Sequence, residues 1–154
     1  MSELSTYEDE LRKNGKIIHT NVGTSMMPLL RENRDVMIIE RHDGRLKKYD
    51  VPLYKRPDGK YVLHRILKVR DNDYVICGDH CVHREYGVTD DQILGVLTGV
   101  IRDGKLITMD APLYKLYYHL WCDFFYVRVF ILRVKFFVRR AVSFIGRKVF
   151  SGKK

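Results

Sequence analysis

A serine, a histidine and an aspartate in this sequence are of the types that together catalyse acyl transfer. Ser25 lies in the stretch GTSMMPLL, where neither helix nor strand periodicity asks for a small polar residue. A serine hydroxyl becomes a nucleophile only when a neighbouring base takes its proton. His64, in the apolar segment YVLHRIL, is the candidate base, and Asp79, in CGDH, is the candidate acid that would orient the imidazole.

Each of the three residues also has an ordinary structural explanation. A serine near glycine and proline usually belongs to a turn. A histidine inside a strand is most often half-buried and hydrogen-bonded for structural reasons, and Gly-Asp is common in turns. What favours the catalytic interpretation is the combination of the three motifs in this order along the chain.

Residues 18–101 resemble type I signal peptidases and the wider group of serine peptidases related to them. The letters S-M-M-P match the family's S-M-x-P box. The resemblance therefore implies that Ser25 is the nucleophile, that Met26 helps to form the floor of the substrate cleft and that Pro28 fixes the turn. It further implies a compact, mainly β catalytic domain and a serine endopeptidase that cuts a signal or leader peptide, with no cofactor.

Further boxes follow in the family order. KKYDVPLYKR resembles the box G-D-(I/V)-V-x-(F/Y), with Asp50 in the aspartate place, and ILGVLTGV resembles the family's closing strand. YVLHRI resembles the box Y-V-K-R-V, with histidine in place of the lysine base. That replacement is typical of the endoplasmic-reticulum and archaeal subgroup, which some spore-forming bacteria also have, and it implies that His64 is the base.

The acid that completes the site has more than one candidate. CGDH resembles the family's G-D-N box and puts Asp79 in the acidic position. In the histidine subgroup a second acid follows six residues later, and here that residue is Glu85. Asp79 is the first choice because it follows a strand that should pair beside His64. Glu85 is the alternative, and Asp90 and Asp91 are less favoured.

The mechanism that the resemblance implies needs a donor for the developing oxyanion. The backbone N–H of Ser25, on a turn opened by Gly23, would supply one hydrogen bond. Position 23 is not a serine, so a side-chain donor is not available there. The expected substrate is a peptide or protein with small residues beside the cut and an extended segment that docks as an added strand.

Two features depart from the family pattern. Arg34 precedes Asp35 where the family usually has Gly-Asp. The first sixteen residues, MSELSTYEDELRKNGK, are polar and acidic and contain no apolar run. We therefore expect neither a signal peptide nor an N-terminal membrane anchor.

A metal site is the rival interpretation of the stretch CGDHCVH. Thiolates and imidazoles at short spacing are zinc ligands. The stretch holds five side chains of ligating types, namely Cys77, Asp79, His80, Cys81 and His83. The paired C-x-x-C knuckles of a structural zinc site are absent from the sequence, so we expect no bound metal. Three cysteines are an odd, sparse set, which favours a reducing compartment over a disulfide scaffold.

Short apolar segments separated by Gly, Asp and Pro turns predict a compact β-rich catalytic domain over residues 1–110. A helix over 5–14 should precede its strands, with Ser5 or Thr6 as the candidate cap. Strands are expected over 16–22, 35–41, 51–56, 61–70 and 74–79, with two more within 92–109.

Positive charge is concentrated in residues 111–154. This segment holds 10 Lys and Arg against the single acid Asp123, so the net charge of +9 lies entirely within it. Pro112 can open a helix here. Apolar residues recur at spacings of three and four and form one stripe: Leu113, Leu116, Leu120, Phe124, Val127, Ile131, Val134 and Val138. Basic residues fall opposite this stripe (Lys115, Arg133 and Arg140) or flank it (Arg128, Lys135 and Arg139).

A basic, aromatic-rich amphipathic helix is typical of proteins that lie in the interface of an anionic membrane. Charged residues interrupt every window of about 20 residues that a spanning helix would need. We therefore expect peripheral membrane association on the cytoplasmic side; a helix packed on the domain or on a partner is the alternative. Nucleic acid would also attract the charge, but the implied β-domain has no base-reading element, so no nucleic-acid partner is expected.

A second class of function stays open. Non-catalytic or self-cleaving regulators, such as the SOS-type repressors, share the fold that the resemblance implies. Those proteins pair serine with lysine and carry an N-terminal DNA-binding domain. This sequence has histidine at the base position, and residues 1–17 are too short for such a domain. The sequence favours the peptidase.

Overall fold

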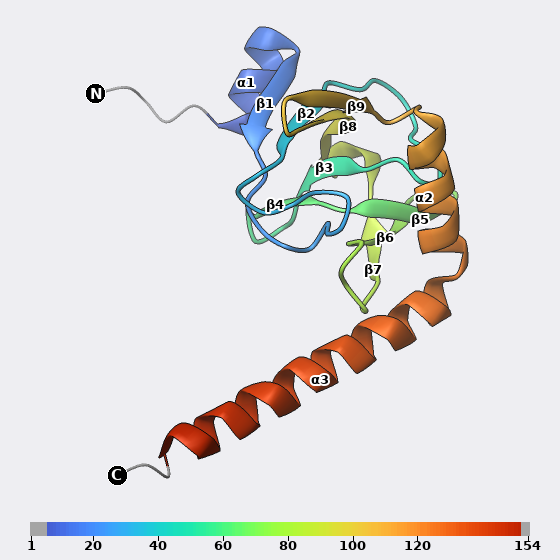
Figure 1. Cartoon of the computed structure of the whole chain (residues 1–154). Coiled ribbons are helices and arrows are strands. Elements are labelled where there is room, and N and C mark those ends of the chain that lie inside the picture. Colours follow the sequence, from blue (N-terminus) through green and yellow to red (C-terminus); the bar gives the residue numbers. More distant parts are fainter. Residues whose placement is uncertain (1–5, 152–154) are drawn as a thin grey trace.

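A computed structural model describes the backbone of residues 6–151 and the side chains of 6–140 and Val142. A curled, antiparallel β-domain is followed by two C-terminal helices (Figure 1). The expected mainly β domain with a helical tail is therefore confirmed.

The elements alternate short strands with turns until residue 108, and only helices follow. In chain order they are α1 (Tyr7–Asn14), β1 (Lys16–Thr20), β2 (Val36–Glu40), β3 (Pro52–Lys55), β4 (Tyr61–Leu63), β5 (Arg65–Val69), β6 (Tyr74–Cys77), β7 (Glu85–Val88), β8 (Ile93–Arg102), β9 (Lys105–Thr108), α2 (Pro112–Asp123) and α3 (Phe125–Ser151), with a short 3-10 turn over Asp90–Gln92 before β8.

The strands form two antiparallel sheets. The larger sheet has the order β1-β2-β8-β3-β4, with β9 paired to β8, and the smaller sheet has the order β5-β6-β7. The single strand expected over 61–70 is in fact two strands, because the chain leaves the first sheet after Leu63 and enters the second at Arg65. His64 is the residue at which this change of sheet occurs. Strand β7 was not expected from the sequence.

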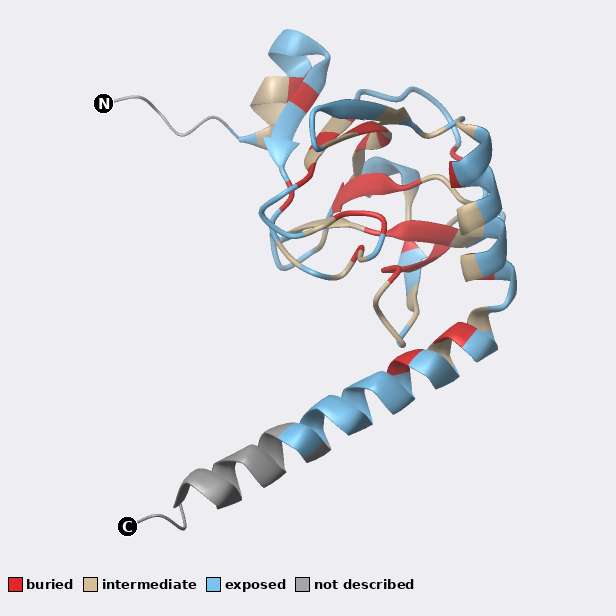
Figure 2. Cartoon of the chain, viewed as in Figure 1, coloured by how far each residue is buried: buried red, intermediate tan, exposed pale blue. Residues whose placement is uncertain are grey.

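The buried residues lie mainly on the strands in the middle of the domain (Figure 2). Their apolar side chains form two clusters. The larger includes Met26 and Leu30 together with Ile17 and Ile39 of the first sheet. The smaller includes Tyr54, Ile66 and Ile76, so it joins β3 to the second sheet. Because the turn that carries Ser25 inserts its neighbour Met26 into the larger cluster, burial of apolar surface holds this turn in place.

The first helix has the caps that its sequence predicts. The side chain of Thr6 accepts a hydrogen bond from the N–H of Asp9 at the N-terminus of α1. Gly15 ends the helix with a φ of 69°, a left-handed conformation that glycine adopts without steric cost. Ser5, the other candidate cap, lies outside the described residues.

Helix α2 packs against the β-domain through its aromatic side chains. The hydroxyl of Tyr114 accepts a hydrogen bond of 2.7 Å from Arg65, and the hydroxyl of Tyr117 donates one of 2.8 Å to Asp79. The indole of Trp121 donates to the backbone oxygen of Asp79 at 2.7 Å. The division expected at residue 110 therefore separates strands from helices, but α2 belongs to the same packing unit as the strands.

The tail bends at Phe124, between α2 and α3, and α3 then runs across the bottom of the domain and past it (Figure 1). All eight residues of the predicted apolar stripe are exposed in the structure. Arg128, expected on the flank of that stripe, is buried instead, with 2% of its surface exposed. Within the described part of the chain, none of the helices combines the length and the apolar character that crossing a bilayer requires.

Candidate active site

Ser25 lies at the start of a tight turn between β1 and β2. The N–H of Met27 donates to the carbonyl of Thr24 at 3.1 Å, and the N–H of Leu30 donates to that of Met26 at 2.9 Å. Met26 is buried with 2% exposed, whereas Ser25 is half-buried. The turn therefore keeps its apolar side in the core and its serine at the surface of a cleft.

Ser25 and His64 line the same cleft, which has a volume of about 260 Å³. Met26 and Met37 line the cleft from the core side, and β4 contributes all three of its residues. The side chain of His64 is only 9% exposed, because Tyr54 of β3 and Glu85 of β7 lie against it. The structure thus brings the serine and the histidine to one cleft, although they are 39 positions apart in the sequence.

The loop between β6 and β7 closes the site at Gly78. A Cβ atom placed on Gly78 would lie 2.6 Å from the carbonyl oxygen of Ser25 and 2.9 Å from Nε2 of His64. These distances are too short for any side chain, so only glycine fits. The N–H of His80 also donates to the carbonyl of Ser25 at 2.8 Å. The Nε2 edge of the imidazole therefore faces the point at which the main chain of Ser25 meets this loop.

Glu85 holds the opposite edge of the imidazole. Its Oε1 lies 2.9 Å from Nδ1 of His64. The hydroxyl of Tyr54 and Nε of Arg56 each donate to Oε2 of Glu85 at 2.9 Å, and a second nitrogen of Arg56 donates to Oε1. An ionised carboxylate can only accept hydrogen bonds. Nδ1 of His64 therefore carries the proton, and Nε2 is left as a proton acceptor.

Asp79, the first choice for the acid, does not contact His64. Both of its carboxylate oxygens accept hydrogen bonds from Arg65, at 2.8 and 2.7 Å, and both side chains are fully buried. His64 and Arg65 are neighbours in an extended stretch, so their side chains point to opposite sides. Asp79 lies on the side of Arg65. The structure corrects the order of preference: Glu85, the alternative, is the acid on the imidazole.

The less favoured acids lie elsewhere. Asp90 accepts hydrogen bonds from Arg45 and Tyr74, and Asp91 is exposed. Asp50 accepts from the N–H of Lys47 at 2.9 Å in a turn, and it is not among the residues that line the cleft.

The surroundings of His64 and Glu85 favour a neutral base beside an ionised acid. Burial lowers the pKa of His64 below the ordinary value of histidine, although the charge of Glu85 opposes this shift. Burial by itself raises the pKa of Glu85, but hydrogen bonds from Arg56 and Tyr54 outweigh it and the pKa is lowered overall. The lowered pKa of His64 favours the neutral imidazole, which is the form that a general base needs.

The residues expected to support the oxyanion and the cleft floor lie beside Ser25. Gly23 has a φ of 104°, and its carbonyl accepts a hydrogen bond of 3.0 Å from the side chain of Asn21. Met26 lines the cleft. Behind the turn, the buried carboxylate of Asp35 binds Arg31 and Arg102, and Arg102 also donates to the carbonyl of Leu29 at 2.7 Å. Asp35 therefore anchors the turn that carries Ser25 to β8, and it does so with Arg34 rather than a glycine before it.

Two residues of the site were not singled out from the sequence. Tyr54 and Arg56 are two positions apart at the end of β3, so they project to the same side and reach the same carboxylate. The alternation in PLYKR is the signal that could have found them.

The metal interpretation of CGDHCVH finds no ligand set in the described part of the chain, where no group of three or more His, Cys, Asp and Glu side chains could hold an ion. Cys77 instead donates to backbone carbonyls of its own loop, including that of His83 at 3.2 Å. All three cysteines are free thiols.

No protein-family model matches the chain, and the comparisons with curated proteins and with solved structures return no match either.

Proposed function

We propose that the protein is a serine endopeptidase of the signal peptidase type, with Ser25 as nucleophile, His64 as general base and Glu85 as the acid that orients the base. The observation that carries the proposal is the position of His64. Its Nδ1 is bound to Glu85, and it shares a cleft with Ser25. A nucleophile, a base and an orienting third group form the arrangement by which a serine is activated.

The proposed reaction has two acyl-transfer steps. Oγ of Ser25 forms a bond to the carbonyl carbon of the substrate while its proton passes to Nε2 of His64. The C–N bond then breaks, and the same proton passes to the leaving amine. Water attacks the resulting ester in the second step, with His64 again taking and returning the proton. Glu85 stabilises the imidazolium each time it forms.

The cleft also suits an extended substrate. Strand β4 is at the edge of the larger sheet, where only β3 pairs with it, and Tyr61, Val62 and Leu63 all line the cleft. An exposed strand edge can accept the backbone of a peptide as an added strand. We therefore propose a peptide or protein substrate that binds along β4, with small residues beside the cut and with its scissile bond at Ser25.

Peripheral association with an anionic membrane through the tail, on the cytoplasmic side, is part of the same proposal. Its support is the apolar stripe of α2 and α3, which no described part of the β-domain covers. Leu113 is 82% exposed and Val127 55% exposed. Such surfaces on a basic amphipathic helix favour the membrane interface.

The test is cleavage of a mixture of synthetic peptides by the full-length protein, with products identified by mass spectrometry. The wild-type protein should cut, and Ser25→Ala should not. Thr24→Ala is the matched control, because it removes the exposed hydroxyl of the preceding residue. Equal turnover by wild type and Ser25→Ala would contradict the proposal.

The same incubation separates the second candidate. A self-cleaving regulator would cut its own chain at a rate per molecule that does not change with protein concentration, and it would leave the added peptides intact.

A further inference from the structure

Helix α3 holds the loop that closes the active site. Arg128, on the side of α3 that faces the domain, donates to Sγ of Cys77 at 3.4 Å and to the carbonyl of Cys81 at 3.3 Å. These two residues flank Gly78, which contacts both Ser25 and His64. The other two nitrogens of the buried Arg128 side chain have no hydrogen-bond partner among the described residues. The bonds to Cys77 and Cys81 are therefore the hydrogen bonds through which Arg128 holds the loop.

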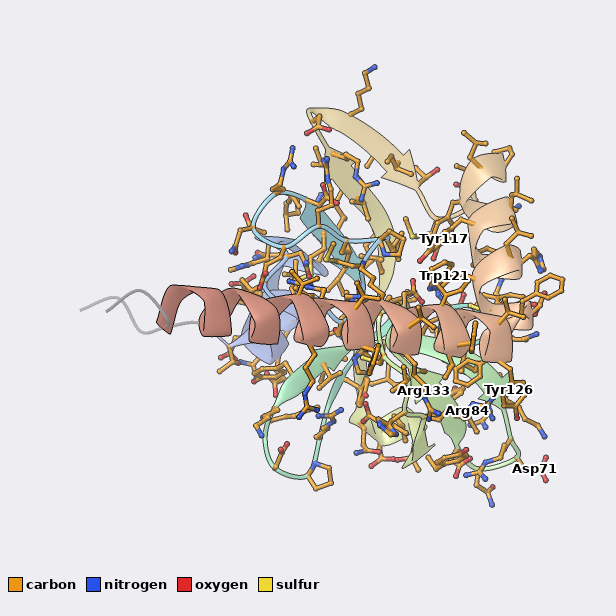
Figure 3. The ribbon with its side chains drawn as sticks, turned by 60° about the horizontal axis from the view of Figure 1, so that its bottom comes forward. Asp71, Arg84, Tyr117, Trp121, Tyr126 and Arg133 are labelled. Atoms are coloured by element: carbon orange, nitrogen blue, oxygen red, sulfur yellow. The ribbon has the colours of Figure 1, made fainter. Side chains whose placement is uncertain are left out.

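Aromatic contacts join the same loop to α3 on either side of Arg128. The ring of His80 packs against Phe136 with 5.3 Å between ring centres. The guanidinium of Arg84 lies 4.0 Å from the ring centre of Phe125 and also contacts Tyr126 (Figure 3). The backbone N–H of His80 donates to the carbonyl of Ser25. A displacement of α3 would therefore also move the main chain at Ser25.

The opposite side of α3 has no cover in the described structure. Its exposed apolar residues, here called the outer face, are Val127, Phe130, Ile131, Val134, Phe137 and Val138. β-branched and aromatic residues have low helix propensity, and a helix in a protein owes most of its stability to packing of its apolar side. A helix of this composition therefore needs a partner on the outer face to stay fully formed.

An anionic lipid surface fits this face better than a second copy of the chain. Arg133, Lys135, Arg139 and Arg140 of α3 are all exposed, and Lys135 and Arg139 lie close enough to His80 of the domain to act on its charge. Asp123, the single acid of the tail, is already bound by Lys48 and Tyr49. Two copies would bring like charges together, whereas a bilayer supplies an apolar interior and negative headgroups at once.

We propose that binding of an anionic bilayer to the outer face of α3 switches the active site on. Lipid binds the formed helix and not the frayed one, so it shifts the population towards the state in which α3 holds the 77–84 loop. The loop then keeps Gly78 and His80 against Ser25 and His64. This regulation rests on the proposed peptidase function, but its structural half can be measured without any cleavage.

The experiment measures amide hydrogen exchange of His80 and Cys81 in the full-length protein, together with cleavage of a soluble peptide. Both are recorded without vesicles, with phosphatidylcholine vesicles and with vesicles that contain phosphatidylserine. If the loop opens only when α3 detaches, anionic vesicles at about ten times the dissociation constant should slow exchange roughly tenfold. Peptide cleavage should rise on the same addition, and high salt should reverse both effects.

Two variants separate binding from switching. The double variant Phe130→Glu/Phe137→Glu should lose vesicle binding, the slower exchange and the faster cleavage. The control Ile18→Glu/Leu106→Glu makes the same charge change at exposed apolar residues of β1 and β9, and it should keep vesicle binding and both effects. Arg128→Met keeps the outer face and removes the hydrogen bonds to the loop. It should float with anionic vesicles as wild type does but show neither slower exchange nor faster cleavage.

The outcomes distinguish this inference from the proposed function. Slower exchange with no cleavage of any peptide would support the coupling and contradict the peptidase. Cleavage and exchange that do not respond to anionic vesicles would keep the peptidase and overturn the coupling. Exchange that slows with protein concentration in the absence of lipid would also overturn it, because the outer face would then bind a second copy.

Discussion

Nδ1 of His64 lies 2.9 Å from Oε1 of Glu85, although 21 positions separate the two residues in the chain. His64 precedes β5 and Glu85 opens β7, so the contact passes over β6, the strand between them. Asp79, which follows β6 directly, is turned the other way and binds Arg65. The two carboxylates therefore have different tasks, one at the imidazole and one in the packing of the domain.

Replacing Glu85 should affect turnover far more than stability. Glu85→Gln keeps the size of the side chain but loses the charge that orients and stabilises the imidazolium. The loss of the equivalent group in serine peptidases of another fold is on the order of 10⁴ in kcat. We expect a loss of that kind with a melting temperature close to wild type, measured by peptide cleavage and thermal unfolding of the same sample.

Replacing Asp79 should have the reverse profile. Asp79→Ala leaves the fully buried Arg65 without its carboxylate, and breaking a buried ion pair costs about 3–5 kcal/mol of stability. Tyr117 of α2 loses its hydrogen bond to the carboxylate as well, whereas Trp121 keeps its bond to the backbone oxygen of residue 79. Denaturant titration should show this loss. Unchanged stability with a loss of activity as large as that of Glu85→Gln would return the orienting role to Asp79.

The pH dependence of kcat/KM should report His64. Since burial holds the pKa of His64 below the ordinary value for histidine, the base stays unprotonated to lower pH than an exposed imidazole would. Activity should rise with pH through an acid limb that lies below about 6.5. Glu85→Gln removes the charge that opposes the shift, so its limb should move to still lower pH. A limb at or above the ordinary value of histidine would contradict this assignment.

Adding a methyl group at Gly78 should damage the site directly. The Cβ of Gly78→Ala would meet the carbonyl of Ser25 at 2.6 Å and Nε2 of His64 at 2.9 Å, so the loop or the catalytic residues must move. We expect a large fall in kcat. Gly59→Ala is the control: its Cβ meets nothing within 4 Å, and its φ of 82° costs only stability, of about 1 kcal/mol. Wild-type turnover by Gly78→Ala would show that the loop does not set the geometry.

Protonation of Asp35 should lower the free energy of unfolding of the protein in acid. Burial by itself raises the pKa of this carboxyl, but Arg102 and Arg31 lower it to about 2. A carboxyl whose pKa is lower in the folded than in the unfolded protein stabilises the fold at pH values above its unfolded-state pKa. That stabilisation is lost as the pH falls through the pKa of the folded state. Between about pH 4 and pH 2 the contribution of about 2 kcal/mol should disappear.

The check on Asp35 is denaturant unfolding over the same pH range. Asp35→Asn should be less stable than wild type at pH 7, and the difference should shrink towards pH 2. Asp43→Asn, at a carboxylate with 88% of its side chain exposed, should change stability little at any pH. A difference between Asp35→Asn and wild type that stays constant from pH 7 to pH 2 would contradict the assigned pKa.

Much of the fold can be predicted from local pattern. The turns at Gly and Asp, the alternating strands, the helix capped by Thr6 and the helical start at Pro112 all depend on residues close together in sequence. The same holds for the serine and histidine motifs, whose unusual residue types stand out in their segments. The concentration of charge in 111–154 is a property of composition alone.

Three features were decided only by tertiary packing. Which acid meets His64 depends on the register of β5, β6 and β7, because a shift of one residue reverses the side to which a carboxylate points. Which side of the tail packs on the domain depends on where Tyr114, Tyr117 and Arg128 find partners. The apolar periodicity locates the stripe but does not show whether it meets the domain, a partner or a membrane. Helix α2 packs on the β-domain because its side chains complete the hydrogen bonds of the buried pair Arg65 and Asp79. Charged groups taken out of water are stable only when their remaining hydrogen-bonding atoms are satisfied. The spacing of residues in the sequence does not show which distant side chains supply those bonds.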